Sequence, residues 1–254
     1  DGQWVPIKNN YSFQLFDFLI NYFLDIIEPN QIFHQNPANN ISEVINNFHN
    51  YIMMILIAVL IAVTYLMIQS FLGDLYSRNL TDHPKLELIW TIIPAIILLF
   101  IAFPSLHLLY VMDEVIEPSV SIKAIGNQWY WSYEYGDYAD YEIEFQSYMV
   151  STQDLKEGDI RLREVDNRVV VPVNSNVKVL TTSNDVIHCW AVPSLGVKVD
   201  SLPGRLNQTS FTTNRPGLFL GACSEICGSE HSFMPISVES VSMNLFAKWI
   251  LSFS

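Results

Sequence analysis

Two long runs of uncharged, largely apolar residues constrain this chain more than any other feature of its sequence. Residues 52–72 contain no charged side chain in 21 positions, and residues 88–112 contain none in 25. A helix of about 20 apolar residues is long enough to cross the hydrocarbon core of a membrane. Two buried helices of a soluble protein are the alternative, but charge-free runs of this length are unusual there. The sequence therefore predicts a transmembrane hairpin over residues 41–112, with spans at about 48–72 and 88–112.

The few basic residues near the spans predict an orientation for the hairpin. The loop between the spans carries Arg78 and Lys85, the flank before the first span carries no Lys or Arg, and the flank after the second carries only Lys123. Lys and Arg collect on the inner side of membranes. We therefore expect the loop to face the inner compartment, with both termini and the whole C-terminal part facing outward.

The segment before the hairpin, residues 1–40, is predicted to be an extension with an amphipathic helix at about 12–28. Its polar side chains recur at intervals of three and four residues, with apolar residues between them: Gln14, Asp17, Asn21, Asp25 and Glu28. Because this polar stripe is acidic, we expect the helix to pack against another membrane subunit rather than to adhere to anionic lipid. The chain begins with Asp rather than Met, which suggests a processed end.

From residue 113 onward the sequence changes character. Short segments rich in Val, Ile, Thr and aromatic residues alternate with Gly, Pro, Asn and Asp, which is typical of an antiparallel β-sandwich or barrel. A short helix is expected from about residue 243. Residues 113–254 hold 18 acidic and 10 basic side chains, a net charge of −8. This charge disfavours nucleic acid as a partner and is compatible with a basic protein.

The β region also holds an unusual set of metal-binding side chains. They comprise all three cysteines, the region's two histidines and a methionine: His188, Cys189, Cys223, Cys227, His231 and Met234. Soft thiolate and thioether ligands with imidazoles favour copper, and two thiols with one imidazole each suit a pair of copper ions. Two alternatives stay open at this point. A Cys223–Cys227 disulfide would leave the histidines and Met234 unexplained, and a zinc site would leave Met234 unexplained.

The segment CSEICGSEHSFM at residues 223–234, which begins 35 positions after His188, resembles the dinuclear copper (Cu-A) site of the subunit 2 family of haem–copper cytochrome c oxidases. The resemblance covers roughly residues 42–250. It also rests on the segments WTIIPAIILLFIAFPSLHLLYVMDEV, IKAIGNQWYWSYEY, RLREVDNRVVVPV and WAVPSLGVKVDSLPGRLNQ. It implies an α+β membrane protein in which a two-helix transmembrane hairpin is followed by a cupredoxin-like Greek-key β-barrel.

The resemblance also implies an activity, partners and a location. Such a subunit belongs to an oxidoreductase and translocase. It accepts electrons from cytochrome c at two copper ions and passes them to haem a of subunit 1, where oxygen is reduced to water and protons are pumped. The implied partners are subunit 1, the other subunits of the complex, cytochrome c and membrane lipid, with no nucleic acid. The implied location is the mitochondrial inner membrane with the β domain in the intermembrane space, although a bacterial plasma membrane also fits the sequence.

Carried over to this sequence, the resemblance implies the following site residues. The copper ligands would be His188, Cys223, the backbone carbonyl of Glu225, Cys227, His231 and Met234. The carboxylate of Glu225 would help to hold a Mg²⁺ shared with subunit 1. Trp129 would receive electrons, and Glu87 would form the mouth of a proton-uptake route. The docking patch for cytochrome c would comprise Gln128, Tyr130, Glu134, Asp137, Asp140, Glu142 and Asp166.

Cys189 departs from the family, which usually has Ser or another residue without a thiol at this position. Neighbouring residues on a strand point to opposite faces, so we expect the Cys189 thiol to point away from the ligand His188. His107, inside the second span, suits either an interfacial anchor or a functional role. Three rival interpretations are a Cu-A domain that serves another reductase such as nitrous oxide reductase, a quinol oxidase subunit, and a membrane-tethered copper carrier. Glu87 and the hairpin disfavour the first, and the complete ligand set disfavours the second.

Overall fold

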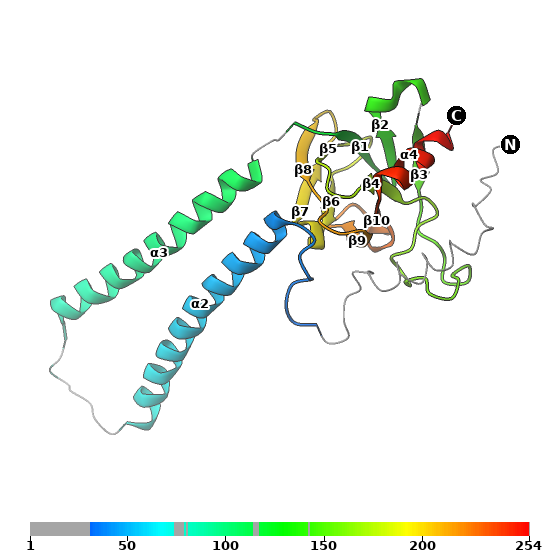
Figure 1. Cartoon of the computed structure of the whole chain (residues 1–254). Coiled ribbons are helices and arrows are strands. Elements are labelled where there is room, and N and C mark those ends of the chain that lie inside the picture. Colours follow the sequence, from blue (N-terminus) through cyan, green and yellow to red (C-terminus); the bar gives the residue numbers. More distant parts are fainter. Residues whose placement is uncertain (1–30, 74–78, 80, 114–116, 142, 254) are drawn as a thin grey trace. The chain divides into compact units, whose positions relative to one another are not determined.

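The computed structural model describes residues 31–73, 79, 81–113, 117–141 and 143–253 (Figure 1). The amphipathic helix expected at 12–28 lies outside the described residues. Contacts divide the chain into a helical unit, residues 43–114, and a β unit that combines residues 115–254 with the segment ending at Ser42.

Two long helices, α2 (Asn40–Leu72) and α3 (Pro84–Asp113), form the helical unit (Figure 1). Both are long and apolar enough to cross a membrane, as the charge-free runs predicted. Each helix is preceded by a residue whose side chain accepts a backbone hydrogen bond from the first turn. Asn39 Oδ1 accepts the N–H of Ser42 at 2.7 Å, and His83 Nδ1 accepts the N–H of Leu86 at 3.1 Å.

The side chain of Tyr51 compensates for a backbone hydrogen bond that is missing in α3. Pro104 lies inside this helix and has no N–H, so it cannot bond to the carbonyl of Phe100 four residues earlier. The hydroxyl of Tyr51 on α2 donates to that carbonyl oxygen at 3.2 Å. This contact therefore satisfies a carbonyl group that would otherwise face the membrane interior unpaired.

We predict that Tyr51→Phe weakens the association of α2 and α3 by about 1 kcal/mol, the usual size of an interhelical hydrogen bond in a membrane. The measurement is the free energy of separating the helices in the full chain, from SDS titration with a fluorophore on each helix. Pro104→Ala restores an N–H for the Phe100 carbonyl, so the cost of Tyr51→Phe should nearly vanish in that background. An undiminished cost there would show that Tyr51 acts through packing.

In the described part of the β unit, ten strands form two five-stranded sheets, with strand orders β3-β2-β1-β5-β8 and β4-β10-β9-β6-β7. The strands are β1 Val120–Asn127, β2 Tyr130–Tyr135, β3 Glu144–Ser147, β4 Val169–Pro172, β5 Val177–Ser183, β6 His188–Val192, β7 Val197–Ser201, β8 Asn207–Phe211, β9 Gly217–Cys223 and β10 Pro235–Val241. Short 3₁₀ helices lie at Gly136–Tyr141 (η1), Pro193–Leu195 (η2) and His231–Phe233 (η3), and the expected C-terminal helix is α4, Met243–Leu251.

Most strand pairs are antiparallel, as expected, but two are parallel. β1 pairs with β5 in parallel, and so does β4 with β10. The local composition of the sequence predicts each strand. It does not predict a parallel partner, because a long crossover connection separates the two strands in the sequence.

The two sheets enclose a core of large aromatic side chains. Trp131, Tyr133, Trp190 and Phe219 are each at most 1% exposed. The Trp190 indole N–H donates to the hydroxyl of Tyr133 at 3.3 Å, and burial raises the pKa of this tyrosine. α4 closes one side of the sandwich, where Trp249 packs against the rings of the core strands β2 and β3. This packed core gives the ends of β6 and β9, which carry the candidate ligands, a rigid support.

Candidate metal centre

Side chains from separate parts of the β unit meet at one end of the sandwich. His188 is the first residue of β6, and Cys223 is the last residue of β9. Cys227 and His231 lie on the loop between β9 and β10, and Met234 directly precedes β10. Because β6 and β9 are hydrogen-bonded neighbours, the sheet brings His188 to the same end as Cys223.

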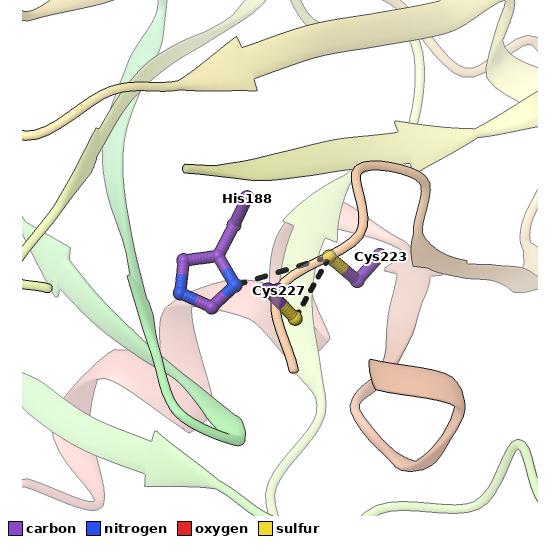
Figure 2. A group of neighbouring side chains, drawn as sticks. All are labelled: His188, Cys223 and Cys227. Atoms are coloured by element: carbon purple, nitrogen blue, oxygen red, sulfur yellow. Dashed lines mark hydrogen bonds between the residues drawn. The ribbon is translucent and has the colours of Figure 1, made fainter. Parts of the chain in front are cut away.

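The two thiols each face one imidazole and one another. His188 Nδ1 lies 3.9 Å from Cys223 Sγ, and the two sulfur atoms are 4.0 Å apart. Figure 2 shows these three side chains directed toward one another. Cys227 Sγ lies 3.4 Å from His231 Nδ1. Each thiol therefore has one imidazole nitrogen within 3.9 Å.

Two weaker donors complete this set. Met234 Sδ lies 3.6 Å from Cys227 Sγ, and the backbone oxygen of Glu225 lies 3.3 Å from Cys223 Sγ. Both cysteines are at most 6% exposed, Met234 is 1% exposed and His188 is 0% exposed. The structure thus brings all six predicted ligands together. Two thiols, two imidazoles and a thioether at these positions fit copper by the softness of their donor atoms.

The disulfide alternative does not describe this structure. A disulfide needs an S–S distance of about 2.05 Å, whereas Cys223 and Cys227 are free thiols whose sulfurs are 4.0 Å apart. Burial opposes ionisation of Cys223, but its hydrogen bonds, led by that with His188, lower its pKa. Burial and the charge of Cys223 raise the pKa of Cys227. The first thiol of the pair therefore ionises more readily than the second, and bound cations would favour the second thiolate.

Asp185 fixes the ring of His188 through the ring nitrogen that does not face Cys223. Its Oδ1 lies 2.8 Å from His188 Nε2, which leaves Nδ1 directed at the sulfur. Burial lowers the pKa of His188, but Cys223 and Asp185 outweigh this effect and raise it. Gly126 makes room for the ring, because a Cβ atom there would lie 2.7 Å from His188 Cδ2. Carboxylates that orient a ligating histidine in this way are common around metal sites. Neither Asp185 nor Gly126 was predicted from the sequence as part of the site, although Asp185 lies only three residues before His188.

The environment of Cys189 agrees with the expectation that it is not a ligand. Its side chain is 1% exposed, and burial followed by a hydrogen bond with Asp200 raises its pKa to about 12. Among the described residues, the group of titratable side chains close enough to hold one metal ion comprises His188, Cys223 and Cys227, without Cys189. The backbone of Cys189 still supports the site, because its carbonyl accepts the N–H of Ser224, the residue after Cys223, at 3.2 Å.

Trp129 lies beside the ligand loop, in the turn between β1 and β2. A Cβ atom on Gly228, the residue after Cys227, would lie 2.9 Å from Trp129 Cζ2. The indole therefore packs directly on the backbone next to a candidate ligand. Its ring is partly buried against the core.

The structure brings some of the docking candidates together and separates others. Tyr130 stacks on Tyr148 with ring centroids 4.5 Å apart, and the N–H of Tyr148 donates to Asp166 at 2.8 Å. Gln128 and Tyr130 flank Trp129, so these candidates share the metal end of the sandwich. Glu134 lies farther along β2 in an ion pair with Lys123 at 2.9 Å. Asp137 lies beyond the opposite end of β2, where it accepts the N–H of Ser121. The side chain of Asp140 and the whole of Glu142 lie outside what the structure describes.

The two candidates in the helical unit are exposed within the described residues. Glu87 lies in the first turn of α3, and its carbonyl accepts the hydroxyl of Thr91 at 2.8 Å. His107 lies in the same helix, near its end at Asp113.

A helical hairpin fit to cross a membrane, followed by a β-sandwich that gathers soft ligands at one end, defines a membrane-anchored protein with a cupredoxin-like domain and a candidate copper site. Comparison with known proteins makes this more specific. The family model described as cytochrome C oxidase subunit II, periplasmic domain, matches residues 120–241, and that for its transmembrane domain matches residues 28–108. The chain therefore belongs to the family of subunit II of cytochrome c oxidase, a subunit of haem–copper terminal oxidases.

Individual relatives agree with this assignment. Cytochrome c oxidase subunit 2 of Metridium senile is 55% identical over 235 residues, which cover 92% of this chain and 95% of the relative. The Drosophila melanogaster protein is 56% identical over 218 residues, covering 86% and 95%. The crystal structure of the periplasmic domain of subunit II from Bradyrhizobium japonicum is 47% identical, with a TM-score of 0.51. It covers 55% of this chain and 96% of that domain.

Proposed function

We propose that this chain receives electrons from cytochrome c at a dinuclear copper centre and passes them to haem a of subunit 1. The observation that carries the proposal is the paired arrangement of the thiols, with Sγ atoms 4.0 Å apart and one histidine Nδ1 within 3.9 Å of each sulfur. The thiolates of Cys223 and Cys227, the imidazoles of His188 and His231, the thioether of Met234 and the carbonyl of Glu225 would hold the two copper ions. The bound pair would supply one-electron redox chemistry.

The protein's own contribution is to hold these ligands still. His188 is fixed between Gly126 and Asp185, and Cys223 ends a strand that is hydrogen-bonded on both sides. Ligands that do not move when the charge of the centre changes keep the reorganisation that accompanies each electron small. A buried site of this kind also keeps water away from the thiolates. Residues 113–254 would form this domain, residues 41–112 the hairpin and residues 1–40 an extension.

Further roles follow from the family. Trp129 would receive the electron, because its indole packs on Gly228 beside Cys227. The acidic net charge of residues 113–254 would attract a basic cytochrome c. Among the candidates for docking, Gln128 and Tyr130 are the sequence neighbours of Trp129, and Asp166 is linked to Tyr130 through Tyr148. The carboxylate of Glu225 would help to hold Mg²⁺, and Glu87 would admit protons for the oxygen chemistry of subunit 1. The proposed location is the mitochondrial inner membrane, with the β unit in the intermembrane space.

Metal analysis of the purified oxidase tests the proposal. We expect two copper ions per chain and the seven-line EPR signal of one electron shared between two coppers. A single, readily lost Cu(I) would instead indicate a copper carrier, and zinc in place of copper would contradict any electron-transfer role.

A further inference from the structure

Gln128 contacts both halves of the candidate metal centre. Its side-chain Nε2 donates to the backbone oxygen of Cys227 at 2.8 Å. Its backbone N–H donates to Asp185 Oδ2 at 2.7 Å, and the other carboxylate oxygen of Asp185 lies 2.8 Å from His188 Nε2. Gln128 is therefore hydrogen-bonded to the backbone of the candidate ligand Cys227. Through Asp185 it is also linked to the ring of the candidate ligand His188.

Trp129, the next residue, depends on neighbours for its orientation. The indole Nε1 is buried and has no hydrogen-bond partner within the part of the chain that the structure describes. The ring rests on Gly228, where a Cβ atom would lie 2.9 Å from Trp129 Cζ2 and 3.2 Å from Gln128 Nε2. The Gln128 amide and the Trp129 indole thus both pack against Gly228, where a side chain would collide with them. The φ of +126° at this position also favours glycine.

We infer that Gln128 is a positioning residue that holds Trp129 against the Cys227–Gly228 backbone, rather than a surface contact for cytochrome c. The inference rests on the proposed function, because it assigns to Gln128 the alignment of the path between Trp129 and the metal centre. The indole has no hydrogen bond of its own here. The turn that carries it is held at Gln128 by two hydrogen bonds, one from the backbone and one from the side chain. Loss of the side-chain bond removes the link between the turn and the Cys227–Gly228 backbone, while the backbone bond to Asp185 and the ligands stay in place.

Gln128→Met in the complete oxidase tests this inference, because methionine has a similar length and no amide donor. The rate of electron transfer within the complex with a photoreducible cytochrome c should fall, by no more than about fivefold. Loss of one hydrogen bond of about 1 kcal/mol shifts the equilibrium between the held and the displaced turn by that factor, at about 1.4 kcal/mol per tenfold. The Kd for cytochrome c, the copper content and the near-infrared absorption should stay unchanged. Gln128→Glu, which replaces the donor with an acceptor, should give a similar or larger fall. Gln208→Met, on an exposed position of β8, is the matched control and should change nothing.

Several results would overturn the inference. A weaker Kd and an altered salt dependence with an unchanged rate would assign Gln128 to docking instead. Loss of copper in Gln128→Met would show that it supports the ligands themselves. Trp129→Phe separates the inference from its premise. If this variant is slow and Gln128→Met is not, the inference fails and the proposed function stands. If Trp129→Phe is also unchanged, Trp129 does not receive the electron and the inference fails with it.

Discussion

Cys227→Ser should abolish copper binding at the candidate centre, whereas Cys189→Ser should leave it intact. Cys227 Sγ lies within 4.0 Å of Cys223 Sγ, His231 Nδ1 and Met234 Sδ, so its loss removes the donor at the middle of the site. A serine hydroxyl is a poor substitute, because it is a harder donor on a shorter bond. Loss of a hydrogen-bond partner of a ligand typically weakens metal affinity by about 10- to 100-fold, so loss of the ligand should weaken it by more than about 100-fold.

Cys189→Ser is the matched control, because it removes a neighbouring buried thiol by the same substitution. The measurements are the copper content per chain and the near-infrared absorption of the purified oxidase, followed by the rate of reduction by cytochrome c. Copper loss in both variants to the same extent would mean that Cys189 contributes to the site after all. Its hydrogen bond with Asp200 and its separation from the metal-binding group both argue against that outcome.

The hairpin and most of the candidate ligands were predictable because the local sequence is sufficient to identify them. A run of 25 residues without a charge is sufficient to predict a span. Likewise, four of the ligand side chains lie within 12 consecutive residues, from Cys223 to Met234. His188 was found only through the family resemblance and its residue type. Its approach to Cys223 depends on the pairing of β6 with β9, which no local pattern encodes.

The supporting residues could not be predicted for the same reason. Gln128 and Cys227 are 99 positions apart and meet only because the β1–β2 turn lies over the ligand loop. The space that Gly126 leaves for His188 likewise depends on the packing of the two sheets. A glycine in a strand suggests a close approach to its backbone, but it does not reveal the partner.

The predicted domain boundary at residue 40 assigned residues 38 and 39 to the N-terminal extension, although they contact the β unit. The transmembrane family model begins at residue 28, upstream of that boundary. Ala38 is 1% exposed, its N–H donates to Ser194 O at 2.9 Å, and its carbonyl accepts the N–H of Asn214 at 2.9 Å. Asn39 Nδ2 donates to Leu195 O at 2.9 Å. The last residues before α2 are therefore part of the β unit, although the sequence places them 150 positions or more from their partners.

A buried group of charges gives the largest expected effect on stability. Arg168 Nε donates to Glu164 Oε1 at 3.0 Å and its Nη2 to Glu164 Oε2 at 2.9 Å, while Nη1 lies 3.3 Å from Glu239. The Glu164 side chain is only 7% exposed, and that of Arg168 is 30% exposed. Burial lowers the pKa of Arg168, but the two carboxylates outweigh this effect and raise it. The arginine thus ties the loop before β4 to β10.

Arg168→Met should destabilise the β unit by about 2–3 kcal/mol. Removing one partner of a fully buried ion pair costs about 3–5 kcal/mol, because the other charge is left buried without compensation, and the partial exposure of Arg168 reduces this cost. The measurement is denaturant unfolding of residues 117–254, the region whose counterpart from Bradyrhizobium japonicum was crystallised as a separate domain. Arg161→Met, at an exposed position of the same loop, is the control and should change the free energy of unfolding by less than about 0.5 kcal/mol.

A second substitution separates the charge of Arg168 from its packing. If the cost comes from the uncompensated carboxylate of Glu164, the double variant Arg168→Met with Glu164→Gln should recover part of the lost stability, since no unpaired charge then remains at that position. If the cost comes from the alkyl chain of Arg168, methionine already replaces most of it, and Arg168→Met alone should be nearly neutral. An additive double variant would contradict the charge explanation, because side chains in direct contact through two hydrogen bonds should show a coupling energy of about 1 kcal/mol or more.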